Sequence, residues 1–138
     1  AYMERLKTLA ADDQRIHFRG IFPQEKIVDV IYESDVIVFP SLWYENTPLT
    51  ALSVLAARRI LVASNQGGIK SLVEHEKSGF LFPPGDSGIL AAILTKLADD
   101  RSILDRIARE IIPPGRVKNY VDTLLPVYQE VRKSRSNG

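Results

Sequence analysis

The stretch between Pro40 and Thr50 carries the residues best suited to chemistry. Thr47 followed by Pro48 is typical of a helix start, because a threonine hydroxyl can cap the first turn and a proline at the first helical position loses no hydrogen bond. The N–H groups of the next three residues, through Ala51, then have no partner inside the helix and lie at the positive end of its dipole. The pattern predicts either a phosphate-binding helix end or simply a well-capped helix.

A second candidate loop contains the adjacent glycines Gly67 and Gly68. Glycines allow positive φ angles and a close approach of the backbone to a ligand, although a plain strand-to-helix turn explains the same pair. The chain contains no G-x-x-x-x-G-K-[ST], no G-x-G-x-x-G and no G-x-S-x-G. A P-loop nucleotidase, a standard dinucleotide-binding enzyme and the usual serine hydrolase are therefore disfavoured.

Composition excludes several other classes of protein. The 138 residues include no cysteine and two histidines, His17 and His75, so a thiolate nucleophile, a disulfide framework and a structural zinc site are not expected. A net charge of +1 is far from the basic excess of a nucleic-acid-binding protein. No apolar run approaches the roughly 18 residues of a membrane span. We expect no metal, no nucleic-acid partner and no transmembrane segment, in a cytoplasmic setting.

Short apolar runs alternate with segments of helical period in the first part of the chain, at intervals of about twenty residues. This order is typical of right-handed βαβ units and an α/β domain with a parallel sheet. The predicted strands are Ile16–Arg19, Val36–Phe39, Ile60–Ala63 and Phe80–Phe82, and the predicted helices span 24–33, 47–57 and 69–74.

After residue 85 the pattern becomes wholly helical. Asp86 is a candidate N-cap for a helix over about 87–97, and a shorter helix is expected around 103–107. Pro113 and Pro114 should break the chain before a last amphipathic segment over 117–131, in which Pro126 predicts a kink or a break. Residues 132–138 are expected to form a basic, polar, frayed tail.

Five stretches, in order, resemble the carboxyl-terminal domain of retaining, nucleotide-sugar-dependent glycosyltransferases of family 4, which have the GT-B architecture. They are residues 15–20, 34–41, 45–49, 63–69 and 79–86. The resemblance covers residues 1–131. It implies a Rossmann-like three-layer α/β domain with a parallel sheet, incomplete at about four strands, and a helical carboxyl-terminal part.

The resemblance also implies the residues of a donor site. Glu45 corresponds to the first glutamate of the family's motif of two glutamates separated by seven residues, and it would lie by the donor sugar and the reaction centre as the catalytic residue. The amides of Leu49 and Thr50 would meet the distal phosphate, while Gly20 and Ile21 would border the base. The complete donor-binding set is Gly20, Ile21, Asn46, Thr47, Leu49, Thr50, Ser53, Gly67 and Gly68.

Three departures from the family pattern qualify this implication. Ser53 stands where the family has its second glutamate, which holds the ribose hydroxyls. Arg58 and Ile60 replace a usual glycine and proline, so a left-handed residue at 58 would cost about 1 kcal/mol or more relative to glycine. The two strands that bring a basic Arg and Lys pair to the diphosphate do not precede Ala1, which would leave a gap in the family's sheet order.

Two functions follow as hypotheses. The first is the donor-binding part of a glycosyltransferase, which uses a nucleoside diphosphate sugar as substrate, needs no cofactor, and is expected to be inactive as this chain alone. Its partners would be a missing amino-terminal acceptor domain, or another chain covering the open sheet, and an acceptor could bring it to the inner membrane surface. The alternative is a degenerate, non-catalytic relative that serves as an interaction or regulatory module.

Overall fold

The computed structural model describes residues 2–11 and 13–136. Three parallel strands form the sheet in the order β1-β2-β3: β1 (Val36–Phe39), β2 (Ile60–Ser64) and β3 (Phe80–Phe82). Every residue of the central strand β2 is buried, which explains its continuous apolar sequence. The prediction that these three strands are adjacent and parallel is confirmed.

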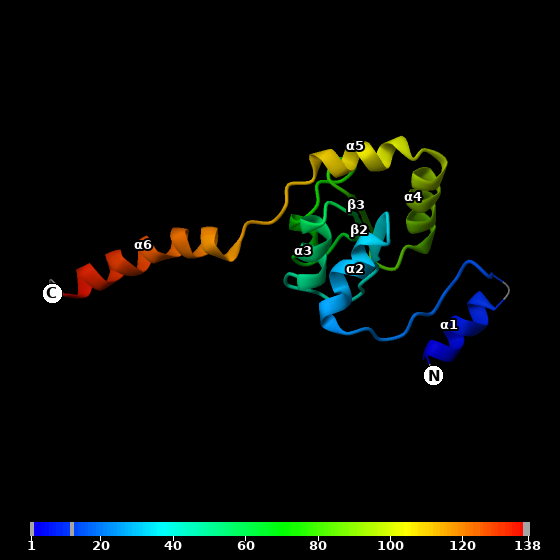
Figure 1. Ribbon diagram of the computed structural model, residues 1–138, viewed down its shortest axis with the longest axis horizontal. Coiled ribbons are helices and arrows are strands. Elements are labelled where there is room, and N and C mark those ends of the chain that lie inside the picture. Colours follow the sequence, from blue (N-terminus) through cyan, green and yellow to red (C-terminus); the bar gives the residue numbers. More distant parts are fainter. Residues whose placement is uncertain (1, 12, 137–138) are drawn as a thin grey trace.

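Helices on both sides of the strands complete the core (Figure 1). They are α2 (Ile27–Tyr32), which follows the 3-10 turn η1 (Gln24–Lys26), then α3 (Leu49–Ala56), α4 (Ser87–Asp99) and α5 (Ser102–Glu110). The side chain of Asp86 caps α4 as expected, because its Oδ1 accepts a hydrogen bond from the N–H of Ile89 at 2.9 Å. The helix expected over 69–74 is only the 3-10 turn η2 (Ile69–Ser71).

The strand predicted at Ile16–Arg19 is wrong, so the sheet has three strands rather than about four among the described residues. This segment follows α1 (Tyr2–Ala10) and leaves Ile16 and Phe18 about half exposed. A strand needs a neighbouring edge for its N–H and C=O groups. The segment does not pair with the free edge of β1, so its apolar residues have no ladder to join.

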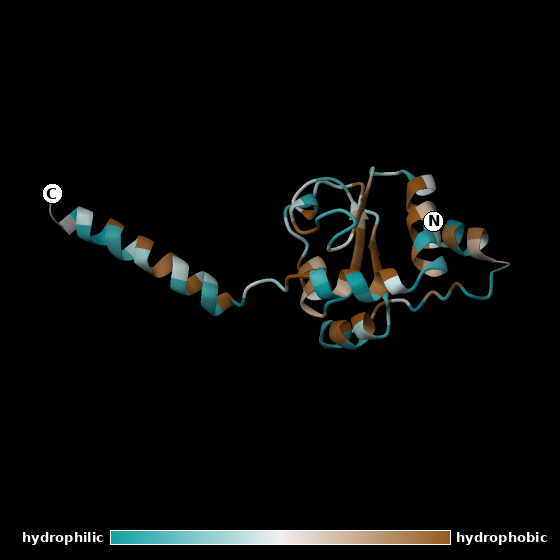
Figure 2. Cartoon of the chain, turned by 90° about the horizontal axis from the view of Figure 1, so that it is seen from above, coloured by the Kyte–Doolittle hydropathy of each residue, from teal (hydrophilic) through white to brown (hydrophobic). Residues whose placement is uncertain are grey.

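The last helix, α6 (Val117–Ser136), extends away from the rest of the protein (Figure 1). It continues through Pro126, so the expected break does not occur, and it includes residues 132–136 of the expected tail; Asn137 and Gly138 lie outside the described residues. Hydrophobic positions, coloured brown, recur along it among hydrophilic ones (Figure 2), and Tyr120, Leu125, Tyr128 and Val131 are exposed.

Arg58 ends α3 in the left-handed conformation, with φ of 53°. The N–H of Arg58 donates to the carbonyl of Leu55 at 3.0 Å, and the N–H of Arg59 donates to that of Val54 at 3.1 Å. These two bonds form the Schellman arrangement, whose left-handed position favours glycine. The backbone expected at this departure from the family pattern is therefore present.

Replacing this residue should stabilise the protein. Arg58→Gly is expected to raise the free energy of unfolding by about 1 kcal/mol, because glycine removes the clash of Cβ with the following carbonyl. Urea unfolding followed by circular dichroism measures the change. Ala57→Gly is the matched control: Ala57 has a φ of −80°, so glycine there should be destabilising. Equal losses of stability in the two variants would contradict this account.

Candidate functional site

The two loops singled out by the sequence meet at the carboxyl ends of β1 and β2. The N–H of Gly68 donates a hydrogen bond to the backbone carbonyl of Glu45 at 2.8 Å. Parallel strands place their following loops at the same edge of the sheet, where open α/β proteins bind ligands. The structure therefore brings the Glu45 loop and the double-glycine loop together, as a shared site requires.

Both glycines are needed for this contact. A Cβ atom on Gly68 would lie 1.3 Å from the carbonyl oxygen of Asn46, and one on Gly67 would lie 2.2 Å from that of Glu45. Gly67 also has a φ of 55°, a conformation that side chains rarely adopt. The absence of side chains thus lets one backbone lie directly on the other and determines where Glu45 stands.

Helix α3 starts one residue later than the sequence predicted. Its N-cap is Pro48 and not Thr47, with no side-chain cap, because the extended ψ of 122° keeps Pro48 outside the helix. The carbonyl of Pro48 accepts hydrogen bonds from the N–H groups of Ala51 and Leu52, at 3.0 and 3.3 Å. The amide of Ala51 is therefore not available to a ligand, which corrects the expectation of three free groups.

The amides of Leu49 and Thr50 remain free. Within the described chain neither donates a hydrogen bond. Both lie in the first turn of an eight-residue helix, where the dipole favours a negative charge. The two groups expected to meet a phosphate are thus the two that the fold leaves unpaired.

Ser53 lies one turn further along the same face of α3 as Leu49. Its hydroxyl donates to the carbonyl of Leu49 at 3.1 Å, a bond within the helix. The side chain is partly exposed, so the position is open to solvent. Ser53 is therefore placed near the free amides, but its short side chain is already engaged by the helix itself.

Gln66 is a positioning residue that the sequence reasoning missed. Its Nε2 donates to the carbonyl of Ser41 at 2.7 Å and to that of Trp43 at 3.0 Å, so it ties the start of one loop to the other. A polar amide two residues after a strand and beside two glycines was the available signal. With two donors on one nitrogen, a glutamine can hold two carbonyl groups at once.

The carboxylate of Glu45 forms no ion pair and accepts no hydrogen bond within the described part of the chain. Other carboxylates are engaged elsewhere: a hydrogen bond from Arg15 lowers the pKa of Asp13 to about 2, and one from Lys96 lowers the pKa of Glu76. Glu45 is also only partly exposed. It is thus a charged group whose position is set by backbone contacts while its oxygens stay uncommitted.

Gly20 and Ile21 are not brought to these loops. They line a separate hollow of about 550 Å³ with residues of α1 and its following segment, such as Lys7 and Phe18, and Ile21 is fully exposed. Gly20 has a φ of 72°. Their segment is the one that does not join the sheet, so their expected place beside a base remains a prediction.

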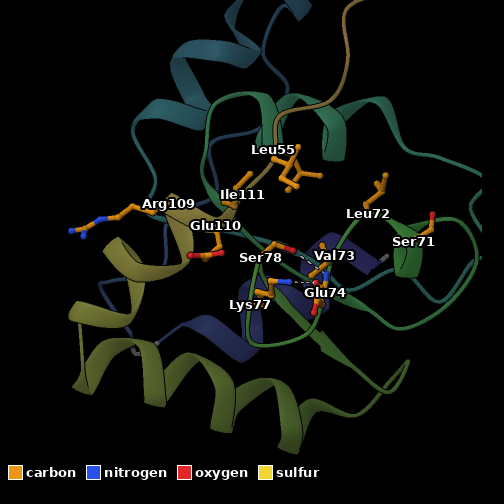
Figure 3. Close-up of a pocket in the computed structure, with 11 residues that line it drawn as sticks. Leu55, Ser71, Leu72, Val73, Glu74, Lys77, Ser78, Arg109, Glu110 and Ile111 are labelled. Atoms are coloured by element: carbon orange, nitrogen blue, oxygen red, sulfur yellow. Dashed lines mark hydrogen bonds and ion pairs between the residues drawn. The ribbon is translucent and has the colours of Figure 1, made fainter. Parts of the chain in front are cut away.

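A larger hollow, of about 650 Å³, lies elsewhere (Figure 3). It is lined by apolar side chains such as Leu55 and Ile111, with an ion pair between Lys77 and Glu74 at 2.8 Å on its rim. Its residues come from the end of α3, the turn before β3 and the end of α5. None of the predicted site residues lines it.

The parallel sheet covered by helices is a Rossmann-like α/β fold. The profile of the family described as "Glycosyl transferases group 1" matches residues 1–100. The chain belongs to this family.

Curated relatives agree with the assignment. The amylovoran biosynthesis glycosyltransferase AmsK of Erwinia amylovora is 36% identical over 102 residues, which cover 68% of this chain and 25% of the relative. The alpha-D-kanosaminyltransferase of Streptomyces kanamyceticus is 28% identical over 121 residues, which cover 85% of this chain and 31% of the relative. The chain thus spans less than a third of the length of these two relatives.

Solved structures confirm the Rossmann-like fold of GT-B type. The Anabaena protein HepE in complex with UDP-glucose superposes with a TM-score of 0.71 at 21% identity, over 99% of this chain and 36% of HepE. Sucrose-phosphate synthase from Thermosynechococcus elongatus gives a TM-score of 0.75 at 22% identity, over 96% of this chain and 34% of the synthase. Across the residues described here, no helix is both long and apolar enough to span a bilayer.

The contact between the two loops predicts the effect of adding one methyl group. Gly68→Ala should lower the free energy of unfolding by about 2 kcal/mol, because its Cβ cannot share space with the Asn46 carbonyl and the loops must separate. Gly115→Ala is the matched control, since a Cβ there meets nothing within 4 Å. Urea unfolding of both variants tests this. If Gly68→Ala were as stable as Gly115→Ala, the close approach would be wrong.

Proposed function

We propose that this chain is the donor-binding unit of a retaining glycosyltransferase, which transfers a sugar from a nucleoside diphosphate to an acceptor without a metal or other cofactor. One observation carries the proposal. The free amides of Leu49 and Thr50 begin the helix that follows Glu45, and the glycine contact holds the uncommitted Glu45 on the same loop. Anion-binding groups and a free carboxylate are thus supplied by a single strand-to-helix connection.

This arrangement suits departure of a nucleoside diphosphate. Negative charge grows on the distal phosphate as its bond to the sugar breaks, and helix-end amides stabilise that charge without reorganising. Glu45 would lie against the sugar, where a carboxylate favours the positive charge that develops at the anomeric carbon. Asn46, Thr47, Gly67 and Gly68 would form the wall between these groups. UDP is the first nucleotide to test, since HepE is described in complex with UDP-glucose.

Most of the acceptor-binding surface would be supplied by protein beyond this chain. The relatives above are about three times as long as this chain, the edge of β1 is open, and the apolar residues of α6 are exposed. We propose that an acceptor-binding unit of a longer protein, or another chain, covers these surfaces, so that the isolated chain has little or no transfer activity. The protein would act in the cytoplasm. If its acceptor is held in the membrane, it would act at the inner membrane surface.

The second candidate function is a non-catalytic interaction module. Two observations favour it. The Ser53 hydroxyl is bonded within α3 rather than free for a ribose, and Arg58 strains the backbone where glycine would not. Nucleotide binding separates the two candidates.

The isolated chain should bind UDP, ADP or GDP with a dissociation constant of about 1 mM, which corresponds to ~4 kcal/mol. Leu49→Pro removes one free amide at the first helical position, where proline is tolerated and where the preceding Pro48 is already extended. It should weaken binding about fivefold to tenfold in calorimetric titration.

Leu49→Ala is the matched control, because it removes the same side chain and keeps the amide. If the two variants had equal affinities for the nucleotides, the start of α3 would not be part of the binding site. Absence of binding to any of the three nucleotides would favour the non-catalytic module, whereas micromolar affinity would show that the surviving site is stronger than proposed.

Ser53→Glu tests the alignment of α3 with the family motif. Its carboxylate should improve binding of UDP over 2′-deoxy-UDP by about 1 to 2 kcal/mol, because charged acceptors bind ribose hydroxyls more strongly than serine does. Ser53→Gln, equal in size but neutral, is the control. An unchanged ribose preference in a normally folded Ser53→Glu protein would mean that position 53 does not face the ribose.

Glu45→Gln should leave UDP affinity within about twofold and lower the transfer rate of a longer, active protein by about 100-fold, because its proposed partner is the sugar. Glu25→Gln, an exposed change in η1, is the control. Rates from a radiolabelled donor, with calorimetry for the nucleotide, check both parts. A matching loss of nucleotide affinity would place Glu45 at the nucleotide instead.

A further inference from the structure

Three large side chains project from the loop immediately before Glu45. Leu42, Trp43 and Tyr44 are 73%, 78% and 75% exposed. Single exposed apolar residues are ordinary on protein surfaces, whereas here three follow one another directly before Glu45. We name the Trp43 and Tyr44 side chains the aromatic pair.

The backbone beneath the aromatic pair is held firmly. The carbonyl of Trp43 accepts hydrogen bonds from the N–H of Glu45 at 3.0 Å, from Nε2 of Gln66 at 3.0 Å and from the hydroxyl of Ser41 at 3.2 Å. The N–H of Trp43 donates to the same Ser41 oxygen at 3.2 Å. The hydrogen bonds therefore fix the backbone from which both side chains extend. This order lowers the conformational entropy that is lost when a ligand binds to the rings.

The rings themselves contribute little to this order. Across the described residues, neither the indole Nε1–H of Trp43 nor the phenol of Tyr44 makes a hydrogen bond, and neither ring stacks on another. Buried tyrosine and tryptophan usually find a partner for their polar atom. Here the polar atoms of two exposed rings are uncommitted, while the backbone that carries the rings is hydrogen-bonded.

The loop that carries the aromatic pair favours a neutral ligand by its own charges. No lysine or arginine occurs between Lys26 and Arg58, so the loop supplies no cation for a phospholipid headgroup or a nucleic acid. Its charged group is the Glu45 carboxylate, followed by the amide of Asn46. A pyranose ring combines an apolar C–H face, which stacks on aromatic rings, with hydroxyls that donate to a carboxylate and to amide oxygens.

We propose that Trp43 and Tyr44 form a stacking platform for a pyranose ring of the acceptor, which makes the acceptor a carbohydrate or a glycoside. The inference rests on the proposed function, because it identifies the ring on the platform as the acceptor from its place one and two residues before Glu45. A sugar stacked there lies next to the carboxylate that would face the donor sugar. The platform would thereby bring the attacking hydroxyl toward the reaction centre.

Tryptophan fluorescence tests the platform directly, since Trp43 is the one tryptophan in the sequence. The full chain is titrated with the methyl pyranosides of glucose, galactose and N-acetylglucosamine, and with glycerol as a polyol without a ring. At least one glycoside should change the emission saturably at millimolar concentration, and glycerol should not. Tyr44→Ala should weaken that affinity at least fivefold, whereas Tyr120→Ala, an exposed tyrosine on α6, should leave it unchanged.

Saturation-transfer NMR on the glycoside provides a readout that does not need the indole. Trp43→Phe should keep the signal, because it keeps a ring, and Trp43→Ala should abolish it. No saturable response to any glycoside, or an equal effect of Tyr120→Ala, overturns the proposal. A shift of emission with phosphatidylglycerol vesicles and not with glycosides also overturns it, in favour of a membrane contact.

Calorimetry with UDP on the same samples separates this proposal from the proposed function. UDP binding without glycoside binding means that the platform is wrong while the donor site stands. Glycoside binding without UDP binding means that the platform exists in a protein that is not a nucleotide-dependent transferase, which overturns its assignment to an acceptor.

Discussion

The contact of one backbone with another at the carboxyl edge of the sheet determines the rest of the site. Gly68 can donate to the Glu45 carbonyl because neither Gly67 nor Gly68 carries a Cβ atom. That contact places the loop after β1 against the loop after β2, and α3 begins where the first loop ends. The positions of Glu45 and of the free amides therefore depend on the close approach that the missing Cβ atoms allow, and not on an interaction between charges.

As a consequence, the backbone atoms of this loop fix its path, while the side chains of the same residues remain free to bind a ligand. Backbone groups and Gln66 hold the loop together, so the side chains of Trp43, Tyr44 and Glu45 remain uncommitted. Such a division lets side chains on the loop change while its path stays the same. Related chains can therefore keep one fold while the side chains of this loop differ.

The features predicted well from the sequence are those with a local cause. The buried strand β2 follows from a continuous apolar run, and the N-cap Asp86 follows from its place directly before a helical pattern. The failures need knowledge of distant neighbours. Ile16–Arg19 has the composition of a strand but does not pair with the open edge of β1, and the bonds of Gln66 exist only because two loops far apart in sequence meet.

Helix α6 has a mechanical consequence. Its 20 residues span about 30 Å, comparable to the diameter of a small domain, and it joins the rest of the protein through Pro113, Pro114 and Gly115. Two successive prolines restrict the chain, so Gly115 is the freest of these joints. A rotation of about 10° there would move the far end of α6 by ~5 Å. A small change in the backbone torsions of Gly115 would therefore move the far end of α6 by a distance comparable to the width of a sugar ring.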